Sequence, residues 1–229
     1  MDKTIFKGGV VMSTKRFVTW IIAFVPMMIT MMVLPVLPDK IPAHYGPGGN
    51  VTRFGSKYEL LTMPIITIGM QVIWLLLEKH LMKDKEKGPH NSQAVFWINL
   101  AVTLTFTVLT VSFLYLAYRG AGSINDIDYR KIVAIALSLS WIVIGNILPK
   151  LKQNGLVGIR TTWTLASENT WYKTHRMGGK IAVITGMASG LLCLFVFNGE
   201  TGIWVSLASS IIMLVSIVIY SYFVYKREG

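Results

Sequence analysis

The stretch IWVSLASSIIMLVSIVIYSYFVY, which runs from Ile203 to Tyr225, contains no Asp, Glu, Lys, Arg or His. A helix needs roughly 20 apolar residues to cross the hydrocarbon of a bilayer, and this stretch is long enough. The whole chain of 229 residues is also apolar and poor in charge, because 53% of the residues are hydrophobic and only 14% are charged. Soluble domains average about 25% charged residues. The stretch therefore predicts a spanning helix of an integral membrane protein and argues against a water-soluble globule.

Five more stretches of the chain are equally apolar and free of charge. They are Phe17–Leu37, Leu60–Leu77, Ala94–Ala117, Ile132–Pro149 and Ile181–Phe197. The first of them has no small-x-small cleavage site before Pro38, so we interpret it as a retained helix and not as a signal peptide. We expect an all-α integral membrane protein: a bundle of six transmembrane helices with a structured outer loop and an inner interfacial loop or helix.

The excess of positive charge, a formal net of +11, indicates how the helices are oriented. Placing both termini in the cytoplasm puts 16 of the 22 Lys and Arg residues on that side and 6 outside, as the positive-inside rule requires. The first loop (Pro38–Glu59) is then external, and the fourth loop (Lys150–Lys180) is cytoplasmic. No soluble fold is left to carry a basic stripe, so we expect no direct contact with nucleic acid. Cys193 is the single cysteine, which excludes an intrachain disulfide and a cysteine metal cluster.

The first loop combines turn-forming residues with aromatic and basic ones between Ile41 and Lys57, which predicts a compact structured turn at the membrane surface. It is either a recognition surface for an external molecule or a folded cap that seals the first two helices. His44 has no cysteine and few carboxylates near it, so we expect no metal site and no cofactor. The candidate binding residues of this loop are Pro42, His44, Tyr45, Arg53, Ser56 and Lys57.

The fourth loop predicts a short helix over residues 166–179, capped by Thr164 or Ser167. Trp171, Tyr172 and His175 would form one amphipathic face of it. The loop is either an interfacial anchor for the fifth span, a docking surface for a cytoplasmic protein or a pocket built around an arginine. Its candidate binding residues are Asn154, Gly158, Arg160, Thr161, Trp163, Thr164, Trp171, Thr174, His175 and Arg176.

Inside the expected spans, the amides of Gln71, Asn99 and Asn146 predict hydrogen bonds between helices. Gly186 and Gly190 form a small-residue stripe for close helix packing, either within one chain or between two. If the amides instead lined a polar cavity, the chain would be a small permease or a lipid-interacting transporter.

An enzyme at the cytoplasmic face would need Arg160 and His175 to converge with a carboxylate such as that of Glu168. The chain shows no Ser/His/Asp arrangement of recognised spacing, no glycine-rich phosphate loop and no paired carboxylates. We therefore expect a protein that is not an enzyme.

Taken together, the two loops resemble the SdpI family of bacterial membrane proteins. The fourth loop supplies Asn154, Gly158-Ile-Arg-Thr161, Trp163-Thr-Leu165, Trp171 and Thr174-His-Arg176, and the first loop supplies Ile41-Pro-Ala-His44, Gly49 and Gly55-Ser-Lys57. The first-loop motif looks like the small uncharacterised domain that precedes the family's signature domain. Two positions depart from the family, which often has Pro where Thr162 stands and an acidic residue where Thr52 stands.

The resemblance implies two domains, residues 1–80 with two helices and residues 90–229 with four. It also implies an immunity protein of the Gram-positive cell membrane that gives resistance to a secreted peptide toxin. In this family the first loop would face the toxin, and the fourth loop would hold a cytoplasmic transcriptional repressor at the membrane. Membrane lipids are further expected partners, and the sequence leaves the oligomeric state open.

Overall fold

The computed structural model describes residues 4–5, 12–46, 51–120, 129–197 and 199–228. Within this part, six helices are long and apolar enough to cross a membrane, which confirms the expected all-α bundle. The chain divides into two compact units, each described here by itself. Unit 1 comprises Met1–Ile73 and Val102–Tyr129, and unit 2 comprises Trp74–Ala101 and Arg130–Gly229. These units arise from packing, and the division into residues 1–80 and 90–229 stays a prediction.

Unit 1 begins with a short antiparallel pair, β1 (Thr4–Ile5) and β2 (Met12–Ser13), directly before helix α1 (Thr14–Val33). At its end α1 tightens into a 3₁₀ turn, η1 (Leu34–Val36). Pro35 enforces this change, because a proline has no amide to continue the α-helical hydrogen bonds.

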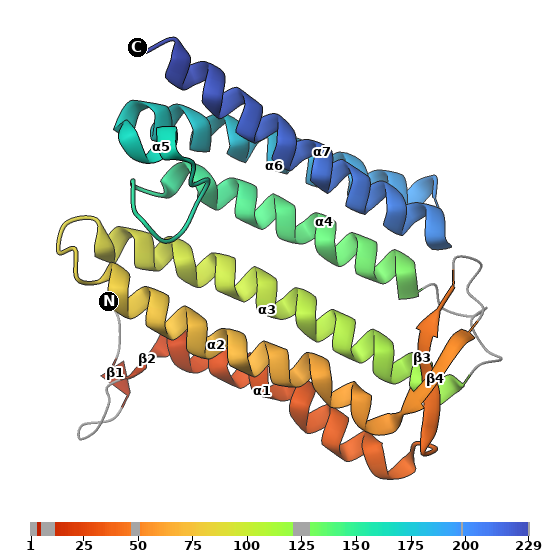
Figure 1. The fold of residues 1–229 in the computed structure, drawn as a ribbon. Coiled ribbons are helices and arrows are strands. Elements are labelled where there is room, and N and C mark those ends of the chain that lie inside the picture. The colour runs from red at the N-terminus through yellow and green to blue at the C-terminus, as the bar shows by residue number, and fades with distance from the viewer. Residues whose placement is uncertain (1–3, 6–11, 47–50, 121–128, 198, 229) are drawn as a thin grey trace. The chain divides into compact units, whose positions relative to one another are not determined.

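The first loop folds as a β-hairpin, a more regular structure than the expected compact turn (Figure 1). Strands β3 (Lys40–Tyr45) and β4 (Val51–Ser56) pair antiparallel, and the 3₁₀ helix η2 (Lys57–Leu61) follows. Residues 47–50, which include Gly49, lie outside the described residues. Ile41 of β3 is buried, and it anchors the hairpin in an apolar cluster with Leu37, Leu60, Leu114 and Ala117.

Two long helices contribute to both units: α2 (Thr62–Leu81) and α3 (Gly88–Arg119). In unit 1 the buried Gln71 side chain donates a hydrogen bond to Thr103 Oγ1 at 2.8 Å. This bond joins α2 to α3 and confirms the expected interhelical role for that amide. Asn146, in contrast, donates to Ile142 O of its own helix at 2.8 Å.

In unit 2, α4 (Tyr129–Ile147) ends in the 3₁₀ turn η3 (Leu148–Lys150), where Pro149 again interrupts the α-helix. The fourth loop then leads to the one-turn helix α5 (Thr162–Ala166) and to α6 (Glu168–Phe195). The last helix, α7 (Gly199–Lys226), packs against α6. In Figure 1 these elements run from green to dark blue.

The expected short helix over residues 166–179 was wrong, because α6 continues without a break into the fifth span. Ser167 caps α6 as expected, since its hydroxyl accepts the Thr170 amide at 3.1 Å. The helix continues through Gly178 and Gly179. These glycines do not end the helix; they let neighbouring elements pack closely against it. A Cβ on Gly179 would lie 2.5 Å from Gly145 O of α4.

The small-residue stripe packs within one chain, which settles the alternative left open by the sequence. A Cβ on Gly186 would lie 2.7 Å from Ser138 O of α4, and one on Gly190 would lie 3.3 Å from Ser138 Cβ. The hydroxyls of Ser138 and Ser189 hydrogen-bond across the same contact at 3.0 Å. The stripe therefore joins α6 to α4.

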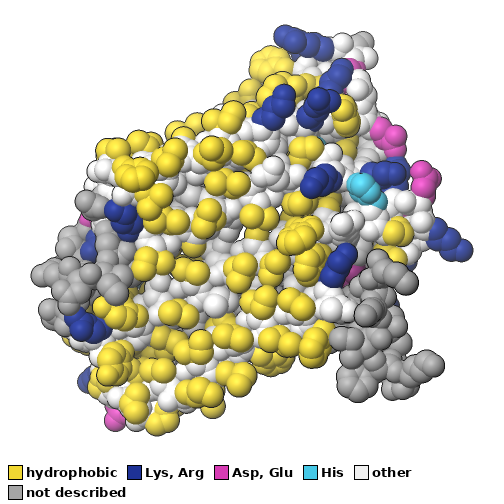
Figure 2. Space-filling view, turned by 180° about the vertical axis from the view of Figure 1, so that it is seen from behind, with side chains coloured by type: hydrophobic (Ala, Val, Ile, Leu, Met, Phe, Trp, Pro, Cys, Tyr) yellow, Lys and Arg dark blue, Asp and Glu magenta, His cyan; other side chains and the backbone are white. Residues whose placement is uncertain are grey.

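The outward surfaces of the helices are rich in exposed apolar side chains (Figure 2). On α7 alone these include Trp204, Ile211, Ile212, Val215 and Ile219. A water-soluble protein rarely exposes so large an apolar surface. Together with six helices of spanning length, this surface identifies a multi-pass membrane protein.

Candidate functional site

Two aromatic side chains of α6 hold the segment between η3 and α5. His175 Nε2 accepts a hydrogen bond from the Ile159 amide at 2.9 Å, and His175 Nδ1 donates to Trp171 O at 2.9 Å. The two rings stack with centroids 4.0 Å apart, and Trp171 Nε1 donates to Leu151 O at 2.8 Å. His175 and Trp171 are 1% and 2% exposed. These contacts use both imidazole nitrogens and require the neutral ring with its proton on Nδ1.

Gly158 is required next to this pair. Its φ of +122° lies in a region that side chains rarely adopt. A Cβ there would overlap His175 Nε2 and lie 3.0 Å from the Trp171 ring. The glycine thus lets the backbone approach the imidazole closely enough for the hydrogen bond of the next residue, Ile159.

Asn154 builds the turn that precedes the glycine. Its side-chain oxygen accepts the amides of Leu156 and Val157 at 2.9 and 2.8 Å. Its side-chain nitrogen donates to the carbonyls of Lys152 and Val157 at 2.9 and 3.1 Å. One amide group therefore satisfies four backbone atoms of a segment that has no regular secondary structure.

Helix α5 begins with a reciprocal cap. Thr161 Oγ1 accepts the Thr164 amide at 3.2 Å, and Thr164 Oγ1 accepts the Thr161 amide at 2.9 Å. The Thr164 hydroxyl also donates to Ile159 O at 2.8 Å. Thr162 is the first helical residue, a position that favours Pro because its amide has no partner within the helix. The threonine at this position is therefore compatible with the cap.

Trp163 fastens α5 to the last helix. Its indole Nε1 donates to Ser221 Oγ of α7 at 2.8 Å, and its ring meets Tyr222 edge to face at 5.5 Å. Neither α7 residue belongs to the sequence motif. Their spacing from Trp163 in the sequence gave no sign of this contact.

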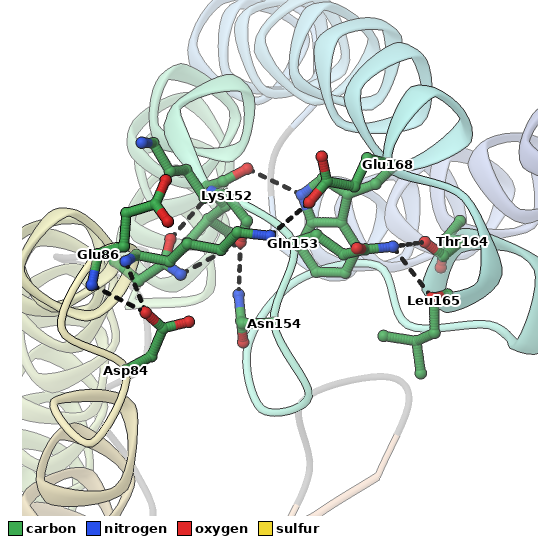
Figure 3. A network of polar contacts seen from close by, with 12 residues as sticks. Asp84, Glu86, Lys152, Gln153, Asn154, Thr164, Leu165 and Glu168 are labelled. Atoms are coloured by element: carbon green, nitrogen blue, oxygen red, sulfur yellow. Dashed lines mark hydrogen bonds and ion pairs between the residues drawn. The ribbon is translucent and has the colours of Figure 1, made fainter.

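The second loop, between α2 and α3, lies against the fourth loop within unit 2 (Figure 3). Asn91 of α3, which is buried, accepts the Lys152 amide at 2.9 Å and donates to Lys152 O at 3.2 Å. His90 Nε2 donates to Lys150 O at 2.6 Å. Lys87 forms an ion pair with Glu168 at the start of α6. The second and fourth loops are therefore joined by direct polar contacts.

Electrostatics within these loops favour the charged forms. The Glu168 carboxylate accepts a hydrogen bond from Lys87 and thereby raises the pKa of Lys87. The backbone amides of Lys87 and Glu86 both donate to Asp84 at 2.9 Å and hold the pKa of Asp84 below its ordinary value. A cavity of about 410 Å³ lies between the loops, and Lys83, Asn91 and Asn154 are part of its lining.

Further contacts of this region were not expected from the sequence. Gln153 Nε2 donates to the Thr164 and Leu165 carbonyls at 3.0 Å, which ties the loop to α5 (Figure 3). Glu228, after the end of α7, accepts hydrogen bonds from the Ser167 and Thr170 hydroxyls, the Asn169 amide and Lys173 Nζ. No local pattern marks these residues, because their partners are far away in the sequence.

Two charged residues of the fourth-loop motif remain exposed. Arg160 lies just before α5, and its guanidinium makes one long hydrogen bond, 3.4 Å, to Leu156 O. Arg176 donates to the Tyr172 hydroxyl at 2.7 Å and lies over that ring. Tyr172 is 53% exposed, so the expected shared face with Trp171 was wrong. Neighbouring residues on a helix point about 100° apart, whereas residues four apart share a face.

Thr174 is fully buried between these exposed positions. Its hydroxyl oxygen has no hydrogen-bond partner in the described part of the chain.

The postulated enzymatic centre is not formed. Both ring nitrogens of His175 hydrogen-bond to backbone groups, and Glu168 pairs with Lys87. Arg160 bonds to a carbonyl oxygen. Within the described residues, no group of three or more His, Cys, Asp or Glu side chains is placed to hold a metal ion.

An apolar cavity of about 350 Å³ lies beside the Gly158–Thr161 segment. Residues of α4, α6 and α7 line it, together with Arg160. A third cavity, of about 150 Å³, lies under the hairpin in unit 1. None of these three cavities is lined by Gln71, Asn99 or Asn146, so they do not support the permease alternative.

The candidate residues of the first loop have mostly internal partners. Arg53 makes a two-pronged ion pair with Glu59, at 2.8 and 3.1 Å. Lys57 pairs with Asp39 at 3.1 Å, and its side chain is 14% exposed. Ser56 caps η2 by accepting the Tyr58 amide at 3.4 Å.

The remaining first-loop candidates differ in exposure. His44 Nδ1 hydrogen-bonds to the Thr52 hydroxyl at 2.6 Å, and both side chains are exposed. Pro42 is buried beneath the hairpin, and the Tyr45 side chain lies outside the described residues. Recognition surface and folded cap thus both remain compatible with this hairpin.

Comparisons with known proteins agree with the two motifs. The model of the SdpI/YfhL protein family matches residues 150–221, and that of a domain of unknown function, DUF1648, matches residues 21–68. Immunity protein SdpI of Bacillus subtilis is 26% identical over 215 residues, which cover 93% of this chain and 97% of that protein. An uncharacterised protein of Archaeoglobus fulgidus is 42% identical over 43 residues, 19% of this chain and 24% of that protein. No solved structure matches the chain. The resemblance inferred from the two loops is thereby confirmed: residues 150–221 are similar to the SdpI/YfhL protein family, and residues 21–68 are similar to the DUF1648 domain.

Proposed function

We propose that this chain is an immunity protein of the bacterial cell membrane that protects against a secreted peptide toxin. One observation carries the proposal: the similarity to Immunity protein SdpI extends over 93% of this chain and 97% of that protein. The similarity therefore includes both loops and all six apolar helices, not just one shared domain. We further propose that both termini are cytoplasmic, as the distribution of Lys and Arg favours.

In this proposal the hairpin of unit 1 receives the toxin. It presents His44 and Arg53 at the surface, and its buried Ile41 holds it on the helices. The ion pair of Arg53 with Glu59 keeps the guanidinium in a fixed place. A guanidinium held in one place suits hydrogen bonding to a segment of a peptide, because less side-chain entropy is lost on binding.

The fourth loop would bind a cytoplasmic transcriptional repressor. Most of its motif residues hold the loop in shape: Asn154, Gly158, Thr161, Thr164, Trp171 and His175 all contact the loop's own backbone or one another. A partner would therefore meet the exposed members, Arg160 and Arg176, together with Tyr172. Aromatic and arginine side chains on a rigid support are the kind that dominate protein interfaces.

Survival of a toxin-sensitive host tests the immunity function. Cells expressing the full chain should survive toxin concentrations that kill cells with the empty vector. Arg53→Gln should reduce this protection, whereas Lys40→Gln, which removes an exposed charge from the same hairpin, should preserve it. An equal amount of membrane-inserted protein with no gain in survival would refute the proposal.

Membrane recruitment tests the signalling function separately. A tagged repressor should move from the soluble to the membrane fraction when the chain and the toxin are both present. The double variant Arg160→Gln and Arg176→Gln should abolish recruitment and leave survival unchanged. Lys226→Gln, at the end of α7, is the matched control. Recruitment that is unaffected by the double variant would exclude this surface as the repressor site.

A further inference from the structure

The cavity beside the fourth loop has an apolar floor and an open rim. Ala182, Met213 and Ile217 form its floor and are at most 2% exposed. Leu214 and Val218 of α7 form part of its rim and are 48% and 43% exposed. These two side chains belong to the exposed apolar surface of α7, a helix long and apolar enough to span a membrane. The cavity therefore borders the surface that a spanning α7 would present to lipid.

The lining of the same cavity also includes one positive charge. Arg160 lines it together with Gly158 and Thr161. No acidic side chain pairs with Arg160 in the described ranges of the chain, and its guanidinium has only the long bond to Leu156 O. Most of its donors are thus free to bind an anion, and a guanidinium matches the geometry of a phosphate.

We infer that this cavity binds an anionic glycerophospholipid of the membrane, with the phosphate at Arg160 and part of one acyl chain against Ala182, Met213 and Ile217. The volume of about 350 Å³ lies within the usual range of ligand sites, roughly 300–1,000 Å³. A mostly apolar lining that includes one positive charge is complementary to an amphiphile with an anionic head. Basic sites between spanning helices are common places for anionic lipids.

The site gives a lipid direct contact with the fourth loop. The Ile159 side chain lines the cavity, while the Ile159 amide is bound to His175. The occupant would therefore touch the segment whose conformation His175, Trp171 and Gly158 determine. This inference does not depend on the proposed immunity function, because lipid binding is measured on the purified protein.

Native mass spectrometry of the purified full chain tests the site. The protein is incubated with dioleoyl phosphatidylglycerol, with dioleoyl phosphatidylcholine or with glycerol phosphate, and retained molecules are counted. One phosphatidylglycerol should be retained in preference to phosphatidylcholine, and glycerol phosphate should not displace it, because it has no acyl chain. Displacement by glycerol phosphate would instead indicate a site for a free phosphate and overturn the inference.

Paired variants separate this site from unspecific binding. Arg160→Gln should lower phosphatidylglycerol retention about tenfold, the loss expected for a charge-assisted phosphate contact. Lys180→Gln, an exposed charge of α6 outside the cavity lining, should leave retention unchanged. Val218→Phe should block the rim, whereas Val215→Phe, also exposed on α7 but outside the lining, should not.

Thermal unfolding verifies that each variant is folded before its lipid retention is compared. Equal phosphatidylglycerol retention by all four variants would overturn the inference. A loss in Lys180→Gln as large as that in Arg160→Gln would overturn it too. Unchanged lipid retention in Val218→Phe would also overturn it, since the rim of the cavity would then not admit the lipid.

Discussion

His175 Nε2 accepts the Ile159 amide at 2.9 Å, so a buried imidazole of α6 determines the path of the fourth loop. The Ile159 side chain packs on the apolar cluster of Ala182, Met213 and Ile217. Ile159 is therefore held in place both by the hydrogen bond of its amide and by the packing of its side chain. This arrangement connects the exposed part of the loop, with Arg160 next in sequence, to the packing of α6 and α7.

Replacing His175 by Ala should destabilise the protein and loosen the loop. The change leaves the Ile159 amide without its acceptor, which costs about 1–3 kcal/mol. Thermal unfolding and limited proteolysis between Leu151 and Thr161 measure the two effects. His175→Gln should restore part of the loss, because its side-chain oxygen can accept the same amide. His80→Ala, an exposed histidine, should have no effect on either measurement. Full stability of His175→Ala would contradict this role.

Gly158→Ala should destabilise the same loop from the other side of the hydrogen bond. The new Cβ would overlap the imidazole and impose a rarely adopted φ, at a cost of about 1–3 kcal/mol. Gly155→Ala is the matched control, since nothing lies within 4 Å of its Cβ position. Melting temperatures of the two variants in the same detergent test the difference. Equal values would show that the close approach of Gly158 is unimportant.

Gly179→Ala should weaken the contact between α6 and α4. Its Cβ would lie 2.5 Å from Gly145 O, and overpacking of this kind costs about 1–3 kcal/mol. Gly69→Ala places the same methyl group on α2 with nothing within 4 Å. We expect a lower melting temperature for the first variant and an unchanged or higher one for the second. The opposite order would rule out tight packing at Gly179.

Glu228 should make stability depend on pH. Desolvation by itself raises the pKa of Glu228, but hydrogen bonds from Thr170, Lys173 and Ser167 outweigh it and leave the pKa below its ordinary value. A lowered carboxylate pKa stabilises the fold above the unfolded value, about 4.3, and this stabilisation is lost as the pH falls through the folded value.

Melting temperatures of the native chain and of Glu228→Gln, measured between pH 7 and pH 3, test this dependence. The native chain should melt higher at pH 7, and the difference should shrink below about pH 4. Glu86→Gln is the matched control, because it also removes one negative charge but from the second loop, away from the contacts of α6 and α7. A difference between the native chain and Glu228→Gln that stays constant over the whole range would refute the proposed contribution.

The apolar stretches predicted all six spanning helices, since a bilayer imposes one requirement of length and composition on each segment separately. The Ser167 cap was also predictable, because a cap depends on residues that are neighbours in sequence. The hairpin in the first loop was missed. Its glycines and prolines indicated turns, but the pairing of β3 with β4 depends on a register that composition does not specify.

The boundary errors have a related cause. Considered on α6 alone, Gly178 and Gly179 can either end a helix or let it pack closely. Only the tertiary neighbours, Gly145 beside Gly179 and Ile159 and Ile217 beside Gly178, show that both are interior positions where a side chain would not fit. Similarly, the sequence placed Trp171, Tyr172 and His175 on one amphipathic face. Only their burial in the structure shows that Trp171 and His175 hold the loop whereas Tyr172 is exposed.

The sequence by itself determined the membrane class, the number of spans and the family motifs, because each of these follows from local composition or from a pattern of residue identities. Tertiary structure alone decided what the motif residues do. Hydrogen bonds between Asn91 and Lys152, Trp163 and Ser221, and His175 and Ile159 join parts that are distant in the chain. Such partners are selected by the packing of whole helices, which brings buried donors and acceptors together because leaving them unpaired is costly.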